Sequence, residues 1–268
     1  MWLKSIGRQV LGHIASKFDY ALVYRGGTPS GQRDEAHRTV YNAYFRGRKF
    51  CCFKDSVVAD FILTGRPWDP HMEQFVRESL ERRTGRTVVE VGANVGASLI
   101  PICSQFAGAE FHLFEPVPAF YQLLQENKSS FEAENARLYN LAISDDDGKV
   151  LEIQCDIGNA GAIVYDNSVL DTVKVEARTL DALFPNVGVA FLKIDVDGYE
   201  FNVLRGAGNL IERAKPDVFL EFYVDLMKEV GVKPESVLAF LQERGLTEFS
   251  LYNNTGGFIE TARSINRV

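Results

Sequence analysis

Positive charge is scarce in this chain. Its 29 lysine and arginine residues are outnumbered by 36 aspartate and glutamate residues, so the 268 residues carry a formal net charge of −7 at pH 7. Nonspecific binding to nucleic acid needs a basic stripe that neutralises phosphates, and the sequence contains none. We therefore expect a small molecule, a glycan or a protein as the partner, and no nucleic acid.

Cysteine is also rare, with four residues in the chain. Cys51 and Cys52 are adjacent, Cys103 and Cys155 lie in apolar stretches, and no C-x-x-C spacing occurs. This spacing excludes a disulfide framework and favours the reduced, buried thiols of a cytosolic protein.

Long hydrophobic runs are absent as well. No uninterrupted apolar stretch approaches the ~20 residues that a membrane span needs, and no cleavable signal is evident. Hydrophobic residues make up 46% of the chain and charged residues 24%, as in ordinary globular proteins. We expect a soluble, cytoplasmic protein without a transmembrane segment.

One stretch organises the remainder of the chain. Residues 87–98 read Thr-Val-Val-Glu-Val-Gly-Ala-Asn-Val-Gly-Ala-Ser, and an apolar stretch follows. A β-branched run, a loop with two glycines and a second apolar run predict a strand, a tight turn and a helix. This unit opens a doubly wound α/β sheet, in which ligands bind at the carboxyl ends of the strands. The turn should therefore contact a ligand.

Two acids indicate which ligand this is. A dinucleotide fold needs G-x-G-x-x-G to cradle a pyrophosphate, whereas Glu90 stands two residues before Gly92 and the next glycine is Gly96. A carboxylate there would repel a pyrophosphate and attract an ammonium. Glu115, at the end of a second predicted strand, is placed to accept both ribose hydroxyls of a nucleoside from a solvated cleft. S-adenosylmethionine fits best, and a nicotinamide dinucleotide is the disfavoured alternative.

The order of the other elements extends this pattern. An antiparallel insertion is expected over residues 149–154 and 172–175, a last helix from Pro234 to Gly245, and a terminal hairpin over 249–252 and 258–261. Parallel strands are expected over residues 87–91, 111–115, 137–143, 190–194 and 218–221. A doubly wound sheet closed by an antiparallel hairpin is the arrangement of class I methyltransferases, a Rossmann-like fold. We assign residues 85–268 to this domain and residues 1–84 to a small mixed α/β cap.

The cap begins with apolar residues at helical spacing: Trp2, Leu3, Ile6, Val10, Ile14 and Phe18. We expect a helix that packs on its own domain or on a second copy of the chain, as in a homodimer; the alternative is a helix resting on an anionic membrane. Asp55 is expected to cap a helix that runs to Thr64, and Asp69 a second helix that starts at Pro70. Trp68 is expected in the core, with a ligand cover as the alternative.

Carboxylates at the predicted strand ends are the candidates for chemistry. Asp195 directly follows an apolar strand and should project into the cleft, and Glu221 ends the next strand at the same rim. Asp197 is expected to cap the following helix, and Glu200 to be the acid of its first turn. Lys193 lies within the strand, where a lysine is usually an edge or snorkelling residue. A divalent metal on Asp195 would lack a histidine partner at metal spacing, so we expect no metal.

The four histidines add little. His112 falls in the middle of a strand and is expected in the core, while His71 lies in a first helical turn near Trp68. Only His71 is a candidate base, so the candidate catalytic residues are Asp195, Glu221 and His71.

Five blocks resemble the FkbM family of methyltransferases. Residues 89–96, Val-Glu-Val-Gly-Ala-Asn-Val-Gly, and residues 192–200, Leu-Lys-Ile-Asp-Val-Asp-Gly-Tyr-Glu, are specific in combination. Supporting blocks lie at 114–118, 140–145 and 203–207, so the resemblance covers about half of the chain. Asp197 stands where the family usually has Glu, and Phe222-Tyr223 where it often has His.

The resemblance implies O-methylation of a hydroxyl, on a sugar or glycan or on a secondary metabolite. A module that binds S-adenosylmethionine without turnover is the alternative, to which the missing histidine lends weight. The candidate cofactor-binding residues are Glu90, Val91, Gly92, Ala93, Asn94, Gly96, Glu115, Pro116, Ala142 and Asp195.

Overall fold

A computed structural model of the chain describes residues 40–54, 56–64, 68–155, 171–222, 224–252 and 258–262. The chain divides into two compact units. The larger unit contains all described residues up to Leu246, and the smaller one contains the C-terminal hairpin. The amphipathic helix expected over residues 2–18, and the homodimer contact expected through it, lie outside the described residues.

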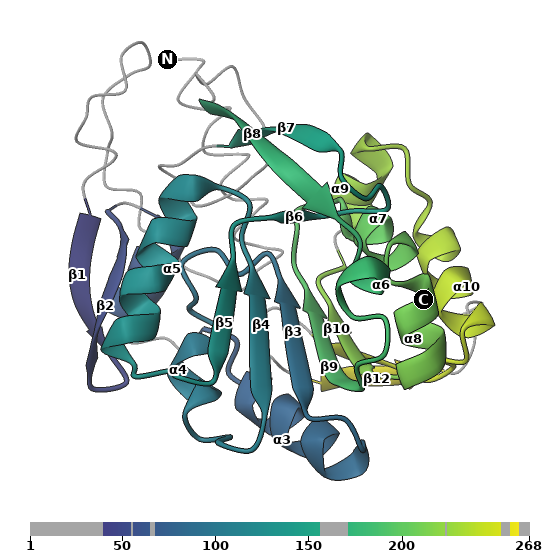
Figure 1. The fold of residues 1–268 in the computed structure, drawn as a ribbon, viewed down its shortest axis with the longest axis horizontal. Coiled ribbons are helices and arrows are strands. Elements are labelled where there is room, and N and C mark those ends of the chain that lie inside the picture. The colour runs from purple at the N-terminus through teal and green to yellow at the C-terminus, as the bar shows by residue number, and fades with distance from the viewer. Residues whose placement is uncertain are drawn as a thin grey trace. The chain divides into compact units, whose positions relative to one another are not determined.

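A five-stranded sheet with the order β10-β9-β3-β4-β5 forms the centre of the larger unit (Figure 1). All four strand pairs are parallel. Of these five strands, β3 comes first in the chain, and it lies between β4 and β9. The strand order therefore reverses between β3 and β9, which creates a topological switch point. The doubly wound sheet predicted from the sequence is confirmed. Its strands are β3 (Thr87–Val91), β4 (Glu110–Phe114), β5 (Ala136–Tyr139), β9 (Val189–Ile194) and β10 (Asp217–Leu220).

The two strands at the switch point are buried along their whole length. Near-continuous apolar runs are typical of parallel strands that are covered on both faces, and β3 and β9 each have such a run with one charged residue in it. These residues, Glu90 and Lys193, are register partners on neighbouring strands. The sheet therefore places two charges side by side in its interior.

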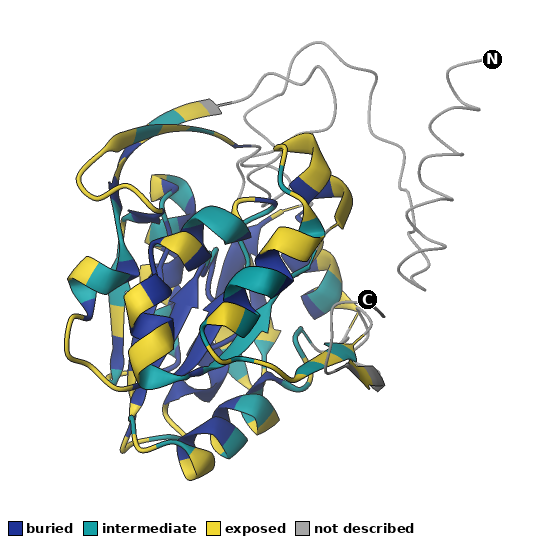
Figure 2. Ribbon diagram, turned by 90° about the vertical axis from the view of Figure 1, so that its right-hand side faces the viewer, coloured by how far each residue is buried: buried dark blue, intermediate teal, exposed yellow. Residues whose placement is uncertain are grey.

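Helices cover both faces of the sheet, and their buried sides face it (Figures 1 and 2). In α5, the predicted inward residues Phe120, Leu123 and Leu124 are buried. None of the helices in the described part of the chain is long and apolar enough to span a membrane. The helices of the larger unit are α2 (Val57–Leu63), α3 (Met72–Arg82), α4 (Ile100–Cys103), α5 (Pro118–Ser130), α6 (Leu180–Leu183), α7 (Glu200–Arg205), α8 (Gly208–Ala214), α9 (Val224–Glu229) and α10 (Pro234–Glu243).

The hairpin of β1 (Val40–Phe45) and β2 (Arg48–Phe53) packs on α5. Asn127 of α5 accepts a hydrogen bond from the Cys51 amide at 2.6 Å and donates to the Cys51 and Val95 carbonyls at 2.8 and 2.7 Å. Residues of this hairpin, of α2 and of α3 belong to the same hydrophobic core as the central sheet. The four cysteines are free and buried, as predicted.

Two predicted helix starts are wrong. The cap of α2 is Ser56, whose hydroxyl accepts from the Ala59 amide at 3.1 Å, whereas Asp55 lies outside the described residues. The helix expected from Pro70 begins at Met72, because Asp69 adopts a positive φ of 43° and its carbonyl accepts from the Met72 amide. The Asp69 side chain is engaged elsewhere and is not a helix cap.

The strand predicted over residues 137–143 is two strands. β5 ends at Tyr139, and β6 (Ala142–Ile143) pairs with β8 (Asp171–Arg178) in a separate three-stranded sheet that also contains β7 (Val150–Cys155). The chain turns at Asn140, whose side chain donates to the Glu115 and Pro116 carbonyls at 2.8 and 2.9 Å. The antiparallel pair predicted as an insertion, β7 with β8, is confirmed.

The predicted terminal hairpin, β11 (Phe249–Tyr252) with β12 (Phe258–Ala262), is also confirmed. These two strands form a two-stranded sheet within the smaller unit.

Candidate functional site

The carboxyl ends of β3, β4, β9 and β10 meet at one edge of the central sheet (Figure 1). The residues that follow these strands are those singled out in the sequence: the loop from Gly92 to Gly96, then Glu115, Asp195 and Glu221. Because the strand order reverses between β3 and β9, this edge is where an α/β sheet of this type binds ligands.

Gly92 allows two loops to meet at the switch point. It has a φ of +85°, and a Cβ atom on it would lie 1.8 Å from the Asp195 carbonyl oxygen. The Asp195 amide in turn donates to the Val91 carbonyl at 3.0 Å. Only glycine permits this approach, so the motif glycine positions Asp195 against the end of β3.

Glu115 holds this loop from the neighbouring strand. Its carboxylate accepts hydrogen bonds from the Asn94 amide at 2.7 Å and from the Val117 amide at 2.8 Å. Only 4% of the residue is exposed, which corrects the expectation that the side chain faces a solvated cleft. Burial raises the pKa of Glu115 to about 8, although both backbone amides act in the opposite direction.

The amides of the glycine loop are engaged within the fold. Those of Gly92 and Ala93 both donate to the Phe114 carbonyl at 3.0 Å, and that of Gly96 donates to the Ala93 carbonyl at 2.8 Å. The Asn94 amide is bound to the Glu115 carboxylate. A loop that binds a pyrophosphate directs such amides at the ligand. This loop therefore does not have the geometry of a phosphate cradle.

A lysine and three carboxylates lie together beneath this edge. The Lys193 ammonium is 2.7 Å from Asp195 Oδ2, 3.3 Å from Glu90 Oε1 and 3.8 Å from Asp69 Oδ2. The expectation of an edge or snorkelling lysine is wrong, because β9 is an inner strand and 2% of the side chain is exposed. Burial lowers the pKa of Lys193, but the three carboxylates together raise it well above its ordinary value.

Glu90 is the most deeply buried acid of the group, with 1% of the residue exposed. Its Oε1 forms an ion pair with Lys193, while its Oε2 has no hydrogen-bond partner within the described residues. Burial raises the pKa of Glu90 to about 7, against the opposing effect of Lys193. Glu90 therefore carries a partial negative charge at neutral pH.

Asp69 reaches the cluster from the segment before α3. The Ser98 hydroxyl, which follows the glycine loop, donates to Asp69 Oδ2. Burial raises the pKa of Asp69, although Lys193 and Ser98 oppose this effect. A quarter of its side chain remains exposed, so its carboxylate lies at the boundary between the cluster and the solvent.

Asp195 and Glu221 form a hydrogen-bonded pair of carboxyl groups. Burial acts to raise the pKa of Asp195, but Lys193 and the hydrogen bond with Glu221 hold it below its ordinary value. Burial and the neighbouring Asp195 raise the pKa of Glu221 well above its ordinary value. The two surroundings thus separate the proton affinities of the pair, and Glu221 is the carboxyl group that binds a proton more readily.

Glu200 is the first-turn acid of α7, as predicted, whereas the cap position is held by Tyr199 and not by Asp197. Its Oε1 accepts from the Gly198 amide at 3.0 Å and from the Val196 amide at 3.2 Å, and the residue is fully buried. These bonds fix the turn after Asp195, in which Asp197 has a positive φ of 50°.

The other sequence-predicted residues lie in different settings. Val91 and Pro116 flank the loops at the ends of β3 and β4. Ala142 lies in β6 and packs with Val175 and Ala177 in a small separate core. His71 directly precedes α3, and its ring centroid is 6.1 Å from that of Phe75.

The sequence pattern did not predict that Lys193, Asp69 and Ser98 belong to the site. The position of Lys193 could have been recognised from the sequence, because a charged residue in an otherwise apolar inner strand needs a buried partner of opposite charge. Asp69 and Ser98 could not have been recognised in this way, because their contact depends on a positive-φ turn.

His112 is a core residue, as predicted. Its Nδ1 lies 2.9 Å from the Tyr139 hydroxyl, and the two rings are stacked. Trp68 packs edge-on against Phe61 beside the main core.

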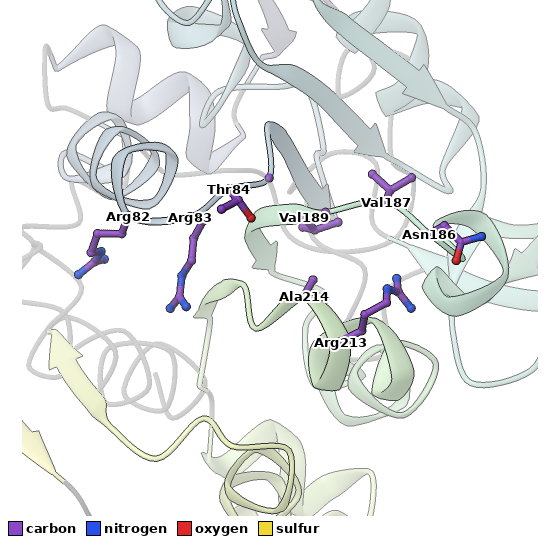
Figure 3. Close-up of a pocket in the computed structure, with 10 residues that line it drawn as sticks. Arg82, Arg83, Thr84, Asn186, Val187, Val189, Arg213 and Ala214 are labelled. Atoms are coloured by element: carbon purple, nitrogen blue, oxygen red, sulfur yellow. The ribbon is translucent and has the colours of Figure 1, made fainter.

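A pocket of about 460 Å³ lies at the opposite, amino-terminal end of the sheet (Figure 3). It is lined by Arg82 and Arg83 of the α3 terminus, by Arg213 of α8 and by the start of β9. These arginines bind protein groups: Arg82 and Arg83 pair with Asp217, and Arg213 donates to the Phe184 carbonyl at 2.7 Å. The chemistry of the carboxyl edge is absent here, so we place the functional site at that edge.

Residues 90–246 match the family described as Methyltransferase FkbM domain. The match covers more than half of the chain. The chain belongs to the FkbM methyltransferase family. The FkbM match begins at Glu90 and includes Glu115, Lys193, Asp195 and Glu221, whereas Asp69 and His71 precede it.

Three solved structures resemble the chain. An FkbM methyltransferase from Methylobacillus flagellatus KT has 18% identity and a TM-score of 0.44, with 75% of this chain and 51% of that chain covered. This chain thus spans about half the length of that protein. A precorrin-6y C5,15-methyltransferase from Geobacter metallireducens GS-15 has 12% identity, a TM-score of 0.41 and coverage of 71% and 82%. A putative O-methyltransferase from Klebsiella pneumoniae has 14% identity, a TM-score of 0.39 and coverage of 76% and 93%. No curated protein matches the chain.

Proposed function

We propose that this FkbM methyltransferase uses S-adenosylmethionine to methylate a hydroxyl group on a sugar, a glycan or a secondary metabolite. The observation that carries the choice of cofactor is the use of the loop amides. Those of Gly92, Ala93 and Gly96 donate to backbone carbonyls, and that of Asn94 donates to the Glu115 carboxylate. This arrangement fits a nucleoside that carries a cation and no phosphate.

The residues at the carboxyl edge fit such a cofactor in charge and in shape. Gly92 leaves room where a Cβ atom would collide with Asp195. Each oxygen of Glu115 accepts one amide, and a carboxylate oxygen can accept a second hydrogen bond, here from a ribose hydroxyl. Asp69 and Asp195 add negative charge at the rim and thus favour a cationic ligand. We assign cofactor binding to the glycine loop, Glu115 and this rim.

Methyl transfer from a sulfonium is an in-line displacement, so most of the catalysis is positioning. When bound, S-adenosylmethionine supplies the electrophilic methyl group. Asp195 would accept the proton that the acceptor hydroxyl gives up when it is methylated. The ionised state of Asp195 and its partial exposure support this role.

His71 stays a candidate base at the start of α3. It stands two residues after Asp69, whose carboxylate lies 3.8 Å from the Lys193 ammonium. An acceptor that binds over Asp69 would bring its hydroxyl toward this segment.

A module that binds S-adenosylmethionine without turnover is the second candidate function. The observation that favours it is Phe222 after Glu221, at the position where the family often has His. A nicotinamide-dependent oxidoreductase is disfavoured, because its pyrophosphate would meet loop amides that are already bound.

Ligand-dependent melting tests the cofactor. We expect S-adenosylmethionine and S-adenosylhomocysteine to raise the melting temperature and NAD to leave it unchanged. At a hundredfold excess over the dissociation constant, the ligand adds about 2.7 kcal/mol to the free energy of unfolding. Stabilisation by NAD alone would overturn the assignment. A screen of glycan and small-molecule hydroxyl acceptors for S-adenosylhomocysteine release then separates an enzyme from a binding module.

A further inference from the structure

Lys193 lies where the charges of the site converge. It is the register partner of Glu90 on β3, and it precedes Asp195 by two residues on the same face of the sheet. Its ammonium group contacts carboxylates from three parts of the chain: the segment before α3, strand β3 and the end of β9. The ammonium is thus a shared cation beneath the edge where the cofactor is proposed to bind.

The three contacts are unequal. The shortest, 2.7 Å, is a hydrogen-bonded ion pair with Asp195, whereas Glu90 and Asp69 lie at 3.3 and 3.8 Å. Of the two carboxylates that keep some exposure, Asp195 with 29% and Asp69 with 26% of the side chain accessible, Asp195 is the one hydrogen-bonded to Lys193, while Glu90 is buried. Lys193 therefore acts most strongly on the carboxylate that can reach an acceptor.

Asp195 and Glu221 can take different roles only if Lys193 acts more strongly on one of them than on the other. Two neighbouring carboxyl groups that share a proton differ in role only if their surroundings differ. Lys193 is hydrogen-bonded to Asp195, whereas Glu221 has its hydrogen bond with Asp195. Within the described residues, the other charged groups that act on the pair or on Lys193 are Asp69, Glu90, Asp197 and Glu200, all of them acids.

We propose that Lys193 is a positioning residue that keeps Asp195 ionised and fixed in place, so that Glu221 holds the proton of the pair and Asp195 receives the proton of the acceptor. This inference rests on the proposed function for the role of Asp195 in turnover. The part of the proposal that concerns the ionisation of Asp195 applies to the protein without cofactor or acceptor and can be tested on it.

Carboxyl-carbon NMR tests the proposal directly. The chain is labelled with ¹³Cγ-aspartate and ¹³Cδ-glutamate, and the Asp195 and Glu221 signals are those lost in Asp195→Asn and Glu221→Gln. Between about pH 8 and about pH 5, we expect the wild-type Asp195 signal to stay at the ionised position. In Lys193→Met, its midpoint should rise by about 1–3 pH units, the usual effect of removing an opposite charge at this distance.

The matched control is Lys174→Met. Lys174 pairs with Glu152 at 2.9 Å on an exposed face of the β7–β8 pair, so its loss should leave the Asp195 signal unchanged. If Lys193→Met does not fold, Glu90→Gln/Lys193→Met removes the cation together with one buried carboxylate and should still show the raised Asp195 midpoint. The wild-type spectrum alone also tests the proposal.

Two results would overturn the proposal. One is an Asp195 midpoint in the folded Lys193 variant that equals the wild-type value. The other is a wild-type spectrum in which Asp195 takes up its proton at higher pH than Glu221. A failure of the proposed function would give a different result. The Asp195 midpoint would still rise in Lys193→Met, but S-adenosylmethionine would not bind or Asp195→Asn would turn over normally. With an active acceptor, the lower pH limit of turnover in Lys193→Met should rise along with the Asp195 midpoint.

Discussion

Glu115 links the cofactor loop to the second strand of the sheet. Its two oxygens accept the amides of Asn94 and Val117, which belong to the loops after β3 and β4. A ribose bound to the same carboxylate would therefore be held by a group that also determines the shape of the glycine loop. Cofactor affinity and loop stability should be coupled at this residue.

We predict that, above about pH 8 where Glu115 is ionised, Glu115→Ala weakens S-adenosylmethionine binding by at least about tenfold, since a hydrogen bond to a charged group contributes roughly 1.5–3 kcal/mol and each 1.4 kcal/mol is a factor of ten. The free energy of unfolding should also fall, because two amides lose their acceptor. Calorimetric titration and urea unfolding measure the two effects. Glu110→Ala, at the exposed start of the same strand, is the control and should change neither. Wild-type affinity in a folded Glu115→Ala protein would mean that the ribose binds elsewhere.

We predict that Gly92→Ala abolishes measurable cofactor binding. It should also lower the free energy of unfolding by more than the strain of a positive φ alone would. A Cβ atom at this position would meet the Asp195 carbonyl oxygen at 1.8 Å. The control is Gly148→Ala, because Gly148 has a similar φ of +80° and nothing within 4 Å of an added Cβ. Gly148→Ala should cost only about 1–2 kcal/mol of unfolding free energy. Equal losses in the two variants would argue against the close contact.

Single residues differed in how well the sequence predicted them. Glu90 and Asp195 were identified because each ends an apolar run that had to be a strand, and parallel strands end at a shared edge. The sequence did not predict that Glu115 is buried, since its exposure depends on the loops that close over it. Asp69 was assigned to a helix cap, a local role, whereas its actual partners are Ser98 and Lys193 from distant parts of the chain.

The bounds of helices and strands were predicted well where hydrophobic periodicity determines them. They were predicted less well where a tertiary contact determines them. The bounds of β3 agree with the prediction, since its β-branched run is buried on every side. The third strand was predicted as one piece, but Asn140 binds two carbonyls of the neighbouring loop and turns the chain between β5 and β6. No local propensity could reveal that contact.

The end of α3 is attached to the start of β10 through Asp217. Its carboxylate accepts from the Ser79 hydroxyl at 2.6 Å and from Arg82 and Arg83 at 3.0 and 2.5 Å. Burial acts to raise the pKa of Asp217, but these partners hold it below its ordinary value. Asp217 is the first residue of β10, and Arg82 and Arg83 also line the pocket at the amino-terminal end of the sheet (Figure 3).

We predict that Asp217→Asn lowers the free energy of unfolding by about 1–3 kcal/mol, the usual effect of leaving charged donors poorly paired in a partly buried site. Cofactor affinity should be unchanged, because the substitution lies at the other edge of the sheet. Urea unfolding and calorimetric titration give the two quantities. Glu132→Gln is the control, since Glu132 pairs with Arg48 in full contact with solvent and its loss should have no measurable effect. A weaker cofactor with unchanged stability would contradict this account.

At the scale of the whole molecule, acidic residues are placed in two different ways. Most of the acids in the described part of the chain are exposed or partly exposed. A smaller group is buried at the carboxyl edge of the sheet with one lysine as its shared cation. The sequence predicted where this group lies along the strands, but not that burial would raise the proton affinity of Glu90 and Glu115.

These buried acids determine how stability depends on pH. Glu90 and Glu115 have pKa values of about 7 and about 8, whereas a glutamate in the unfolded chain has a pKa of about 4.3. Between these values the folded protein binds protons that the unfolded chain has lost. A raised pKa therefore stabilises the fold at low pH, and this contribution is lost as the pH rises through 7 and 8. Asp145 and Asp217 have lowered pKa values, so their contribution is lost as the pH falls below about 4.

We predict that the cofactor-free protein is most stable near about pH 5 and loses stability as the pH rises to about 8, by up to about 1.4 kcal/mol per pH unit for each titrating group. Urea unfolding at constant ionic strength measures this dependence. Glu115→Gln cannot titrate, so the slope between about pH 6 and about pH 8 should be shallower than in the wild type. Glu110→Gln, an exposed change on the same strand, should retain the wild-type slope. Stability that stays constant or increases over this range would show that Glu90 and Glu115 are ionised in the folded protein, and the electrostatic account of the site would then be wrong.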